Sequence, residues 1–413
     1  MNLFIFNESR PAALYGVGTY IQQLTAALQN SNHNICVVTL KQDILKTHIK
    51  QTKGIKYWSI PSPVSEQRII DASKYNELYC RSIVYFLQLH ITNKTNLVFH
   101  LNYLNCTLAE ELKKVFECKI VSTIHYLDWS FILFGNVMRF RNLLTKQEMN
   151  QSDMYKNGVA KLIRDEKRFF ENVDHLICLS ENTRRLLLDD YQINPNKTTV
   201  IHNGLKDNIT DLNKQDIRIK YYMTDIPVII FAGRLDDLKG ILYLLKAFKI
   251  VMNTYPHCQL VIAGNGSLEK YMNDCEDIWI HVTWTGLISS EKLYELYQIA
   301  DIGVLPSLTE QCSYVAIEMM MHGLPMITTS AWGLAEMTED GISGLHVPVT
   351  EHPETVEIDT ELLAEKMLYL LKFPEERKRI GANARRRYES AYSAEIFRRN
   401  MLDFYYSLIN TVE

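Results

Sequence analysis

The sequence predicts an α/β protein with two doubly wound domains that face each other across a cleft. Short apolar runs, typical of strands buried on both faces of a parallel sheet, alternate with longer amphipathic stretches along the chain. The runs form two series, separated by the polar segment 203–220, which is the best domain boundary. We therefore expect a first domain over 1–205, a second over 206–390, and a C-terminal helix over 391–413 that crosses back to the first.

Each series alternates strands with helices. The first predicts strands over Leu3–Phe6, Ile35–Thr39, Leu97–Phe99, Ile120–Ile124, His175–Leu179 and Thr199–Ile201, and helices over Thr19–Leu28, Lys74–Leu89 and Leu108–Phe116. The second predicts strands over Val228–Phe231, Gln259–Ala263, His281–Thr283, Ile302–Leu305 and Met326–Thr328, and helices over Ile241–Val251, Leu268–Asp274, Glu291–Ile299 and Tyr314–Met321.

Composition excludes several classes of protein. The 413 residues carry 44 basic and 48 acidic groups, so the near-neutral balance gives no reason to expect a nucleic-acid partner. No apolar run approaches the ~20 residues of a membrane span, and the first residues lack the basic region of a signal peptide. The eight cysteines are scattered without a CxxC pair, and the twelve histidines show no zinc-type spacing. We expect a reduced, cytoplasmic protein, and a zinc site has little support.

The segment 231–240 follows a predicted strand and leads into a predicted helix, and it contains Arg234 and Lys239. Ligands of open parallel sheets bind outside the carboxyl ends of the strands. Two cations beside a helix N-terminus suit a diphosphate, because free backbone N–H groups and the positive end of the helix dipole add to their charge. Two ordinary surface cations are the alternative interpretation.

The segment 310–318 also follows a predicted strand and leads into a helix. Ser313 is predicted to be the N-cap of a helix that begins at Tyr314. The N–H groups of Tyr314 and Val315 would then lack acceptors within the helix and could hold phosphate or sugar oxygens.

Two carboxylates bracket this helix start. Glu310 lies in the loop before it, and Glu318 lies among apolar residues of the helix itself. A buried carboxylate needs a partner, and a ribose diol can supply two hydroxyl hydrogen bonds to it. The alternative is an ordinary N-terminal acid followed by a solvated helix acid.

Two glycine pairs approach the dinucleotide-binding fingerprint GxGxxG without completing it. Gly16-Val17-Gly18 and Gly264-Asn265-Gly266 would each need a third glycine, but Ile21 and Glu269 occupy those positions. Each pair allows close approach to the backbone, and a tight turn is the simpler interpretation.

Histidines follow three predicted strands of the first domain. His125 comes directly after the strand Ile120–Ile124, and His100 and His202 occupy similar but weaker positions. A ligand contact and a structural hydrogen bond are both open for His125.

Taken together, these segments resemble the retaining glycosyltransferases of family 4, which have the GT-B fold of two Rossmann-like domains. The resemblance extends in order over nearly the whole chain. The matching segments are Gly16-Val17-Gly18, His125, His202-Asn203-Gly204, Gly233-Arg234 with Lys239-Gly240, Gly264-Asn265-Gly266, Glu310 to Glu318, Gly323-Leu324-Pro325 and Asp340–Leu345. The chain departs from the family in carrying Gln311-Cys312-Ser313 where a glycine-containing segment is common.

The resemblance implies roles for individual residues. Arg234 and Lys239 would bind the donor diphosphate, and Glu318 would hold the donor ribose. Glu310 and His125 would be the catalytic residues, both touching the donor sugar. The other donor-binding residues implied are Gly16, Gly18, Ser313, Tyr314, Val315, Gly286 and Leu287.

The implied activity is hexosyl transfer from a nucleotide diphosphate sugar, with UDP and GDP favoured as the nucleotide. The acceptor would be a saccharide, a lipid-linked molecule or a peptide, and the resemblance implies retention of the anomeric configuration without a metal or other cofactor. Three alternatives stay open: a sugar-nucleotide epimerase or phosphorylase of similar architecture, an NAD-dependent oxidoreductase, and an inactive binding subunit.

The segment 129–134 is apolar and is followed by Arg139, Arg141 and Lys146. Such a pattern suits peripheral contact with a membrane or an acceptor. A core helix or loop of the first domain is the alternative.

Overall fold

The computed structural model describes residues 1–9, 16–29, 31–62, 72–145, 154–209 and 212–410, so Lys146 lies outside the described residues. The chain divides into two compact units. Unit 1 comprises Met1–Asp128, Glu148–Gly204 and Ala394–Glu413, and unit 2 comprises Trp129–Gln147 and Leu205–Ser393. No helix within the described ranges is both long and apolar enough to cross a membrane.

Unit 1 contains an eight-stranded sheet in the order β3-β4-β2-β1-β5-β6-β7-β8. The strands are β1 Asn2–Glu8, β2 Asn34–Gln42, β3 His48–Thr52, β4 Ile55–Pro61, β5 Leu97–Leu101, β6 Lys119–Ile124, β7 His175–Cys178 and β8 Thr198–Val200. Neighbouring strands are parallel except for the edge pair β3 and β4. The six predicted strands are confirmed. Strands β3 and β4 are not among the predicted strands. All of β3 is exposed, and the buried residues of β4 are separated by exposed or half-buried ones, so neither strand contains an apolar run.

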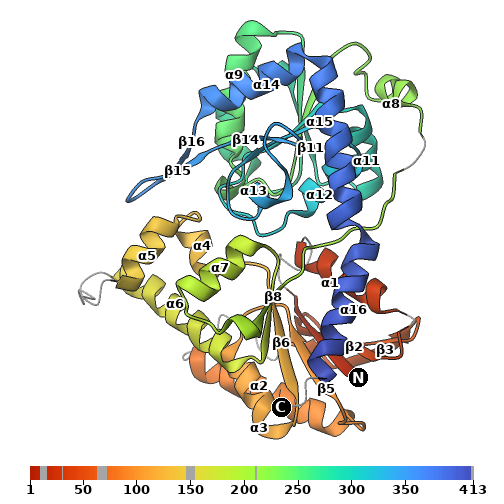
Figure 1. The fold of residues 1–413 in the computed structure, drawn as a ribbon, viewed down its shortest axis with the longest axis vertical. Helices are drawn as coiled ribbons and strands as arrows, with labels where there is room; N and C mark the ends of the chain where they lie inside the picture. The colour runs from red at the N-terminus through yellow and green to blue at the C-terminus, as the bar shows by residue number, and fades with distance from the viewer. Residues whose placement is uncertain (10–15, 30, 63–71, 146–153, 210–211, 411–413) are drawn as a thin grey trace. The chain divides into compact units, whose positions relative to one another are not determined.

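Helices cover both faces of this sheet (Figure 1). They are α1 Gly16–Leu28, α2 Ala72–His90, α3 Cys106–Val115, α6 Met154–Asn172, α7 Glu181–Asp189 and α16 Ala394–Asn410, with the short 3-10 helix η3 at Pro195–Lys197. Helix α3 packs between α2 and α6, whereas α1 packs against α16. Right-handed crossovers place these two groups of helices on opposite faces of the sheet. The reason is that the connection from β1 to β2 runs in one direction along the sheet, whereas the connection from β4 to β5 runs in the other.

A buried polar network fastens α16 to the sheet of unit 1. Tyr405 of α16 hydrogen-bonds to His100 Nδ1 at 2.5 Å, and His100 Nε2 contacts the Thr123 hydroxyl at 2.7 Å. Tyr20 of α1 reaches the same hydroxyl at 2.9 Å. The predicted return of the C-terminal helix to the first domain is confirmed, and His100 acts as a structural residue.

Unit 2 contains a six-stranded parallel sheet in the order β11-β10-β9-β12-β13-β14. The strands are β9 Val228–Ala232, β10 Gln259–Ala263, β11 Val282–Gly286, β12 Ile302–Leu305, β13 Met326–Thr329 and β14 Leu345–Val347; β15 Val349–Glu351 and β16 Val356–Ile358 form a separate antiparallel hairpin. This is the doubly wound order 3-2-1-4-5-6, in which the chain reverses direction between β9 and β12. Ligands of such sheets bind at that reversal.

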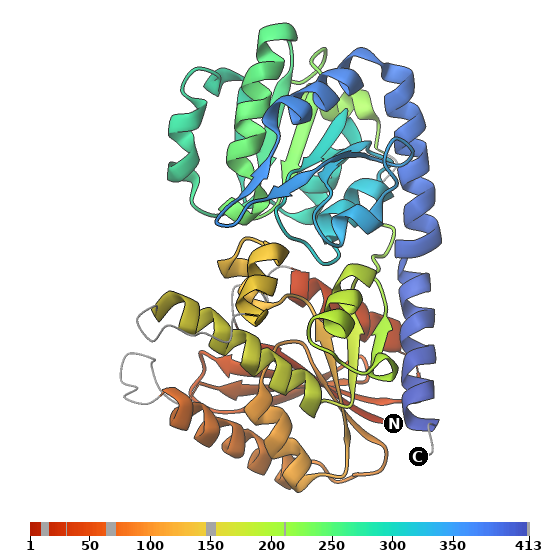
Figure 2. The same ribbon diagram turned by 60° about the vertical axis from the view of Figure 1, so that its left-hand side comes forward.

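Helices also cover both faces of the second sheet (Figure 2). They are α8 Lys214–Lys220, α9 Ile241–Thr254, α10 Leu268–Met272, α11 Ser290–Ile299, α12 Tyr314–Met321, α13 Leu334–Met337, α14 Thr360–Lys372 and α15 Pro374–Arg387. Short 3-10 helices are η4 Asp237–Lys239, η5 Asn273–Cys275 and η6 Trp279–His281, and η7 Tyr388–Tyr392 is a π-helix. Helices α9 and α14 pack side by side over a buried apolar core. On the other face α11 contacts α8, and α12 contacts α15.

Two further helices of unit 2 come from an earlier part of the chain. Helices α4 Asp128–Ile132 and α5 Val137–Thr145 follow β6 in sequence, yet residues 129–145 belong to unit 2 by their contacts. Trp129 and Leu133 are buried there. The interpretation of segment 129–134 as a core helix or loop of the first domain is therefore wrong. Its peripheral contact with a membrane stays a prediction.

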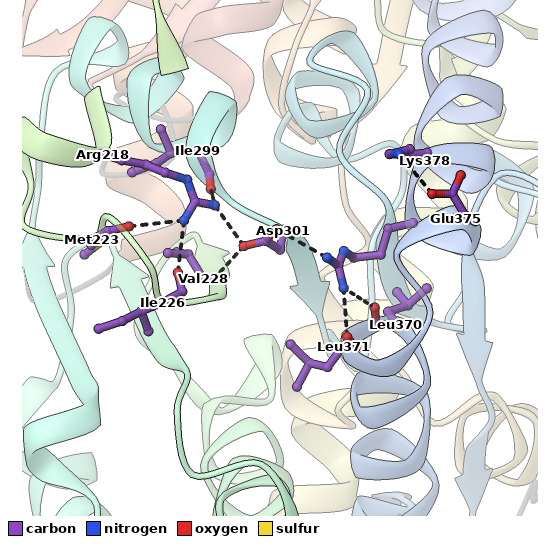
Figure 3. A network of polar contacts seen from close by, with 11 residues as sticks. Arg218, Met223, Ile226, Val228, Ile299, Asp301, Leu370, Leu371, Glu375 and Lys378 are labelled. Carbon is purple, nitrogen blue, oxygen red and sulfur yellow. Dashed lines mark hydrogen bonds and ion pairs between the residues drawn. The ribbon is translucent and has the colours of Figure 1, made fainter. Parts of the chain in front are cut away.

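An ion-pair network lies at the amino ends of β9 and β12 (Figure 3). Asp301 lies between two guanidinium groups, with Arg218 at 3.0 Å and Arg377 at 3.8 Å. Its carboxylate also accepts the Val228 backbone N–H at 2.9 Å. Arg218 donates to the carbonyls of Met223, Ile226 and Ile299, and Arg377 donates to those of Leu370 and Leu371 at the end of α14.

Replacing Asp301→Ala should lower the free energy of unfolding of unit 2 by roughly 2 kcal/mol, because it leaves a backbone N–H and two partly buried cations short of an acceptor. Lys378→Ala is the matched control, since its pair with Glu375 is exposed and should contribute less than about 0.5 kcal/mol. Calorimetric unfolding of both variants measures the difference. Equal stabilities would contradict a structural role for Asp301.

Candidate functional site

The loops that follow β9 and β12 approach each other closely. The Leu308 N–H donates to the Leu238 carbonyl at 2.8 Å. Gly240 adopts a left-handed conformation at φ +69°, and a Cβ there would lie 1.9 Å from the Pro306 carbonyl oxygen. Only glycine fits this position, so the packing of the two loops determines where the neighbouring Lys239 lies.

These loops bring Lys239 and Glu310 into contact. The Lys239 ammonium forms an ion pair with the Glu310 carboxylate, and each side chain is about one-fifth exposed (19%). Arg234 pairs with Asp236 at 3.0 Å, and Asp236 also caps the short turn η4 by accepting the Lys239 N–H. The two cations that are predicted to bind a diphosphate are thus both paired with carboxylates of their own unit.

The pair Gly264-Asn265-Gly266 supports the loop after β9. The Leu235 N–H donates to the Asn265 carbonyl at 2.9 Å, and the Ser267 N–H donates to the Leu235 carbonyl at 3.1 Å. A Cβ at Gly264 would lie 1.7 Å from the Gly233 carbonyl oxygen. The glycines therefore permit two backbone segments of unit 2 to pack together.

Helix α12 begins as the sequence predicts. Ser313 is its N-cap, and its hydroxyl accepts the Ala316 N–H at 3.3 Å, so that prediction is confirmed. Tyr314 and Val315 are the first two helical residues and are half-buried. Their N–H groups lie at the N-terminus of the helix, which is the positive end of its dipole. Glu310 lies in the loop that leads into this N-terminus.

Glu318 lies one turn further along α12 and is half-buried. The Tyr297 hydroxyl donates to its carboxylate at 3.2 Å, and Tyr294 donates as well. Burial raises the pKa of Glu318 to about 7, although the two tyrosine hydrogen bonds lower it. The carboxylate therefore already uses hydroxyl groups as partners, which is the chemistry that a ribose diol would offer.

Tyr294 and Tyr297 are functional candidates that the sequence did not predict. They lie three residues apart on α11, a spacing that puts two side chains on the same helix face. That spacing is visible in the sequence, but their common partner lies on α12, and no local pattern links the two helices.

Gly286 and Leu287 occupy the carboxyl end of β11. Gly286 has φ +65° and its carbonyl accepts the Gly264 N–H at 3.0 Å, whereas Leu287 is largely exposed. They lie at the same edge of the sheet as the loop after β9, because the strands are parallel. Their donor-binding role stays a prediction.

His125 follows β6 in unit 1 and contacts Asn102. Its Nε2 lies 3.0 Å from Asn102 Oδ1, and Asn102 Nδ2 donates to the Phe6 carbonyl at 3.0 Å. That second bond orients the amide, so His125 carries its proton on Nε2 and presents Nδ1 as an acceptor. Burial lowers the pKa of His125 to about 3, which keeps the ring neutral.

The first glycine pair is not a loop. Gly16 and Gly18 lie in the first turn of α1, which begins at Gly16, so the expectation of a tight turn between strand and helix is wrong. Glycine has poor helix propensity, and for this reason the pair favours a loop when only the sequence is considered.

His202 uses Nδ1 to contact the Leu179 carbonyl at 3.0 Å.

The acidic, histidine and cysteine side chains form no metal cluster in the described part of the chain. No group of three or more His, Cys, Asp or Glu residues there is arranged to hold a metal ion. All eight cysteines lie within the described residues, and none of them is in a disulfide bond.

Two family models match the chain in succession. The model described as Glycosyltransferase Family 4 covers residues 15–208, and the model described as Glycosyl transferases group 1 covers residues 213–387. The chain belongs to the family 4 glycosyltransferases. This membership decides against the NAD-dependent oxidoreductase, and the boundary between the two models falls in the polar segment that the sequence indicated.

Curated relatives carry glycosyltransferase names. The alpha-D-kanosaminyltransferase of Streptomyces kanamyceticus is 31% identical over 43% of this chain and 45% of its own length. The D-inositol 3-phosphate glycosyltransferase of Corynebacterium aurimucosum is 27% identical over 84% of this chain and 78% of its own length. The matches thus span from less than half to about four-fifths of these proteins.

Solved structures show the same fold. Sucrose-phosphate synthase from Thermosynechococcus elongatus superposes with a TM-score of 0.75 at 21% identity, over 100% of both chains. The Anabaena protein HepE, in complex with UDP-glucose, superposes with a TM-score of 0.70 at 14% identity, over 98% of this chain and 100% of HepE. The GT-B fold predicted from the sequence is confirmed.

Gly240→Ala should destabilise unit 2 by more than about 3 kcal/mol, because it adds a backbone clash with Pro306 to the cost of a left-handed residue. Gly341→Ala is the matched control: Gly341 has φ +73°, but nothing lies within 4 Å of its Cβ position, so only about 1 kcal/mol of conformational cost is expected. Urea unfolding compares the two. Similar losses in both would contradict the tight approach of the loops.

Proposed function

We propose that this protein is a retaining glycosyltransferase that moves a hexose-type sugar from a UDP- or GDP-sugar to a saccharide, lipid-linked or peptide acceptor. One observation carries the proposal: at the strand-order reversal of unit 2, Lys239 and Glu310 meet, and the Glu310 segment leads into the N-terminus of α12. Family membership and a fold neighbour with bound UDP-glucose support it.

Donor binding would exchange carboxylate partners for phosphate oxygens. The cations of Arg234 and Lys239 are held in place by Asp236 and Glu310, and a diphosphate carries enough negative charge to replace both. The N–H groups at the start of α12 add donors for the same anion. Glu318 would accept the two ribose hydroxyls in place of the tyrosine hydroxyls that it accepts from Tyr294 and Tyr297.

Transfer builds negative charge on the leaving diphosphate and positive character on the sugar. Arg234, Lys239 and the α12 dipole stabilise the leaving group, which is the task that a divalent metal performs in other transferases, and we propose that none is needed. Glu310, released from Lys239, would contact the donor sugar. In front-face attack the leaving phosphate would take the acceptor proton, and His125 would offer Nδ1 to a sugar hydroxyl.

UDP-glucose should raise the melting temperature of the wild-type protein, because a ligand that binds only the folded state stabilises it. Arg234→Ala and Lys239→Ala should lose most of this shift and lower UDP release by about 100-fold, since each removes charge stabilisation from the leaving group. Lys220→Ala is the control: this lysine is also paired with a carboxylate of unit 2, that of Glu295.

Full turnover in both variants would contradict the diphosphate assignment. GDP-sugars tested in parallel decide the nucleotide, and added EDTA tests whether a metal is needed. Analysis of the products with the donor alone, and then with an acceptor, separates transfer from epimerase or phosphorylase chemistry. The anomeric configuration of the transferred sugar tests retention.

Donor affinity should increase as the pH rises through about 7, because the ionised Glu318 accepts two ribose hydroxyls and its pKa is raised to about 7. Below that pH the protonated carboxyl loses acceptor capacity. UDP-glucose is the ligand for this titration, since its diphosphate bears no terminal phosphate that titrates nearby. Calorimetric titration of the protein with UDP-glucose, from about 1.5 units below that pKa to about 1.5 units above it, measures the effect.

Glu318→Gln should bind weakly with a flat pH profile. Glu295→Gln is the matched control, because the Glu295 carboxylate also accepts a tyrosine hydroxyl but its pKa is lowered by Lys220 and Tyr221. A flat wild-type profile would remove Glu318 from the ribose site.

A further inference from the structure

Residues 129–145, which we call the α4–α5 arm, connect to unit 1 in sequence but pack within unit 2. The preceding residue Asp128 hydrogen-bonds through its N–H to Glu166 of unit 1. From Trp129 onward the arm belongs to unit 2, which carries the candidate donor site. The arm has two anchors there.

The first anchor is the β15–β16 hairpin. Asn136 is 1% exposed, and its Nδ2 donates to the carbonyls of His352 at 2.7 Å and Thr355 at 3.1 Å. Its Oδ1 accepts the Arg139 N–H at 2.8 Å, which caps the first turn of α5. Arg139 also pairs with Glu354 at 3.2 Å. These bonds hold the arm in one register against the hairpin.

The second anchor is Trp332. Its indole N–H donates to the Gly135 carbonyl at 3.1 Å, and its ring lies 5.5 Å from that of the fully buried Trp129. Trp129 in turn stacks on Phe140 at 4.2 Å. A tryptophan outside the arm is therefore held by both polar and aromatic contacts with it.

This anchor touches the Glu310 segment from two sides. On one side, a Cβ at Gly135 would lie 2.9 Å from both the Leu308 carbonyl oxygen and Thr309 Cβ. On the other side, the Gly333 N–H, next to Trp332, donates to the Glu310 carbonyl at 2.9 Å. The backbone that presents the Glu310 carboxylate is thus held between the arm and the Trp332-Gly333 segment.

We propose that the α4–α5 arm positions Glu310 for catalysis, and that Trp332 is the positioning residue through which it acts. The inference rests on the proposed function for Glu310, but the coupling of arm and loop is a separate physical claim. A catalytic carboxylate displaced by a fraction of an ångström loses rate without losing the fold.

The test begins with Trp332→Phe, which keeps an aromatic ring beside Trp129 but removes the hydrogen bond to Gly135. Hydrogen–deuterium exchange should become faster in peptides covering 308–311 and 333, whether or not a substrate is known. Trp58→Phe is the matched control, because Trp58 is buried in unit 1 and its indole N–H has no partner among the described residues. It should leave exchange in those peptides unchanged.

The second measurement is UDP release from UDP-glucose in a double-mutant cycle with Glu310→Gln. Trp332→Phe should lower kcat by about ten-fold in the wild-type background while changing KM for the donor by less than about two-fold. In the Glu310→Gln background it should have no further effect, since the carboxylate that it positions is gone.

Three results would overturn the proposal: unchanged exchange at 308–311, unchanged kcat despite faster exchange, or an equal loss of kcat in both backgrounds. The last would mark a general structural defect. A wild-type protein that releases no UDP from any nucleotide sugar would instead refute the proposed function, and the exchange experiment would still decide whether the arm holds the loop.

Discussion

The contact between the loops after β9 and β12 is the constraint on which the candidate site depends. Gly240 has no side chain and lies against the Pro306 carbonyl, and the Leu308 N–H bonds to the Leu238 carbonyl. These contacts place the two loops side by side, although Lys239 and Glu310 are 71 residues apart in sequence. The strand order makes this possible, since β9 and β12 are neighbours where the chain reverses direction.

Electrostatics at this surface is balanced rather than strongly positive. Arg234 and Lys239 each have a carboxylate partner, which keeps these flexible side chains in defined positions. Glu318, by contrast, has no cation beside it among these contacts: its carboxylate accepts tyrosine hydroxyl groups. These hydrogen bonds stabilise its charged form, whereas burial raises its pKa. Both arrangements suit the ligand that we propose, a nucleotide sugar with a diphosphate and a ribose diol.

Features determined by neighbouring residues are predictable from the sequence. Ser313 caps α12 because a serine before an apolar helical run satisfies an N–H three residues later, and β10 and β12 begin and end where predicted. The exposed β3 and the three-residue β14 carry too little pattern to be recognised. Gly16 and Gly18 mislead the prediction because glycine is as typical of loops as it is rare inside helices.

The sequence by itself determined the two-domain α/β architecture, the family, and the candidate residues on the loops of unit 2, because apolar periodicity and motif spacing are local properties. Tertiary structure alone decided that Lys239 pairs with Glu310, that two tyrosines of α11 reach Glu318, and that residues 129–145 pack beside Trp332. Such pairings join residues far apart in the chain. They arise where burial of aromatic rings and satisfaction of backbone hydrogen bonds bring distant segments together.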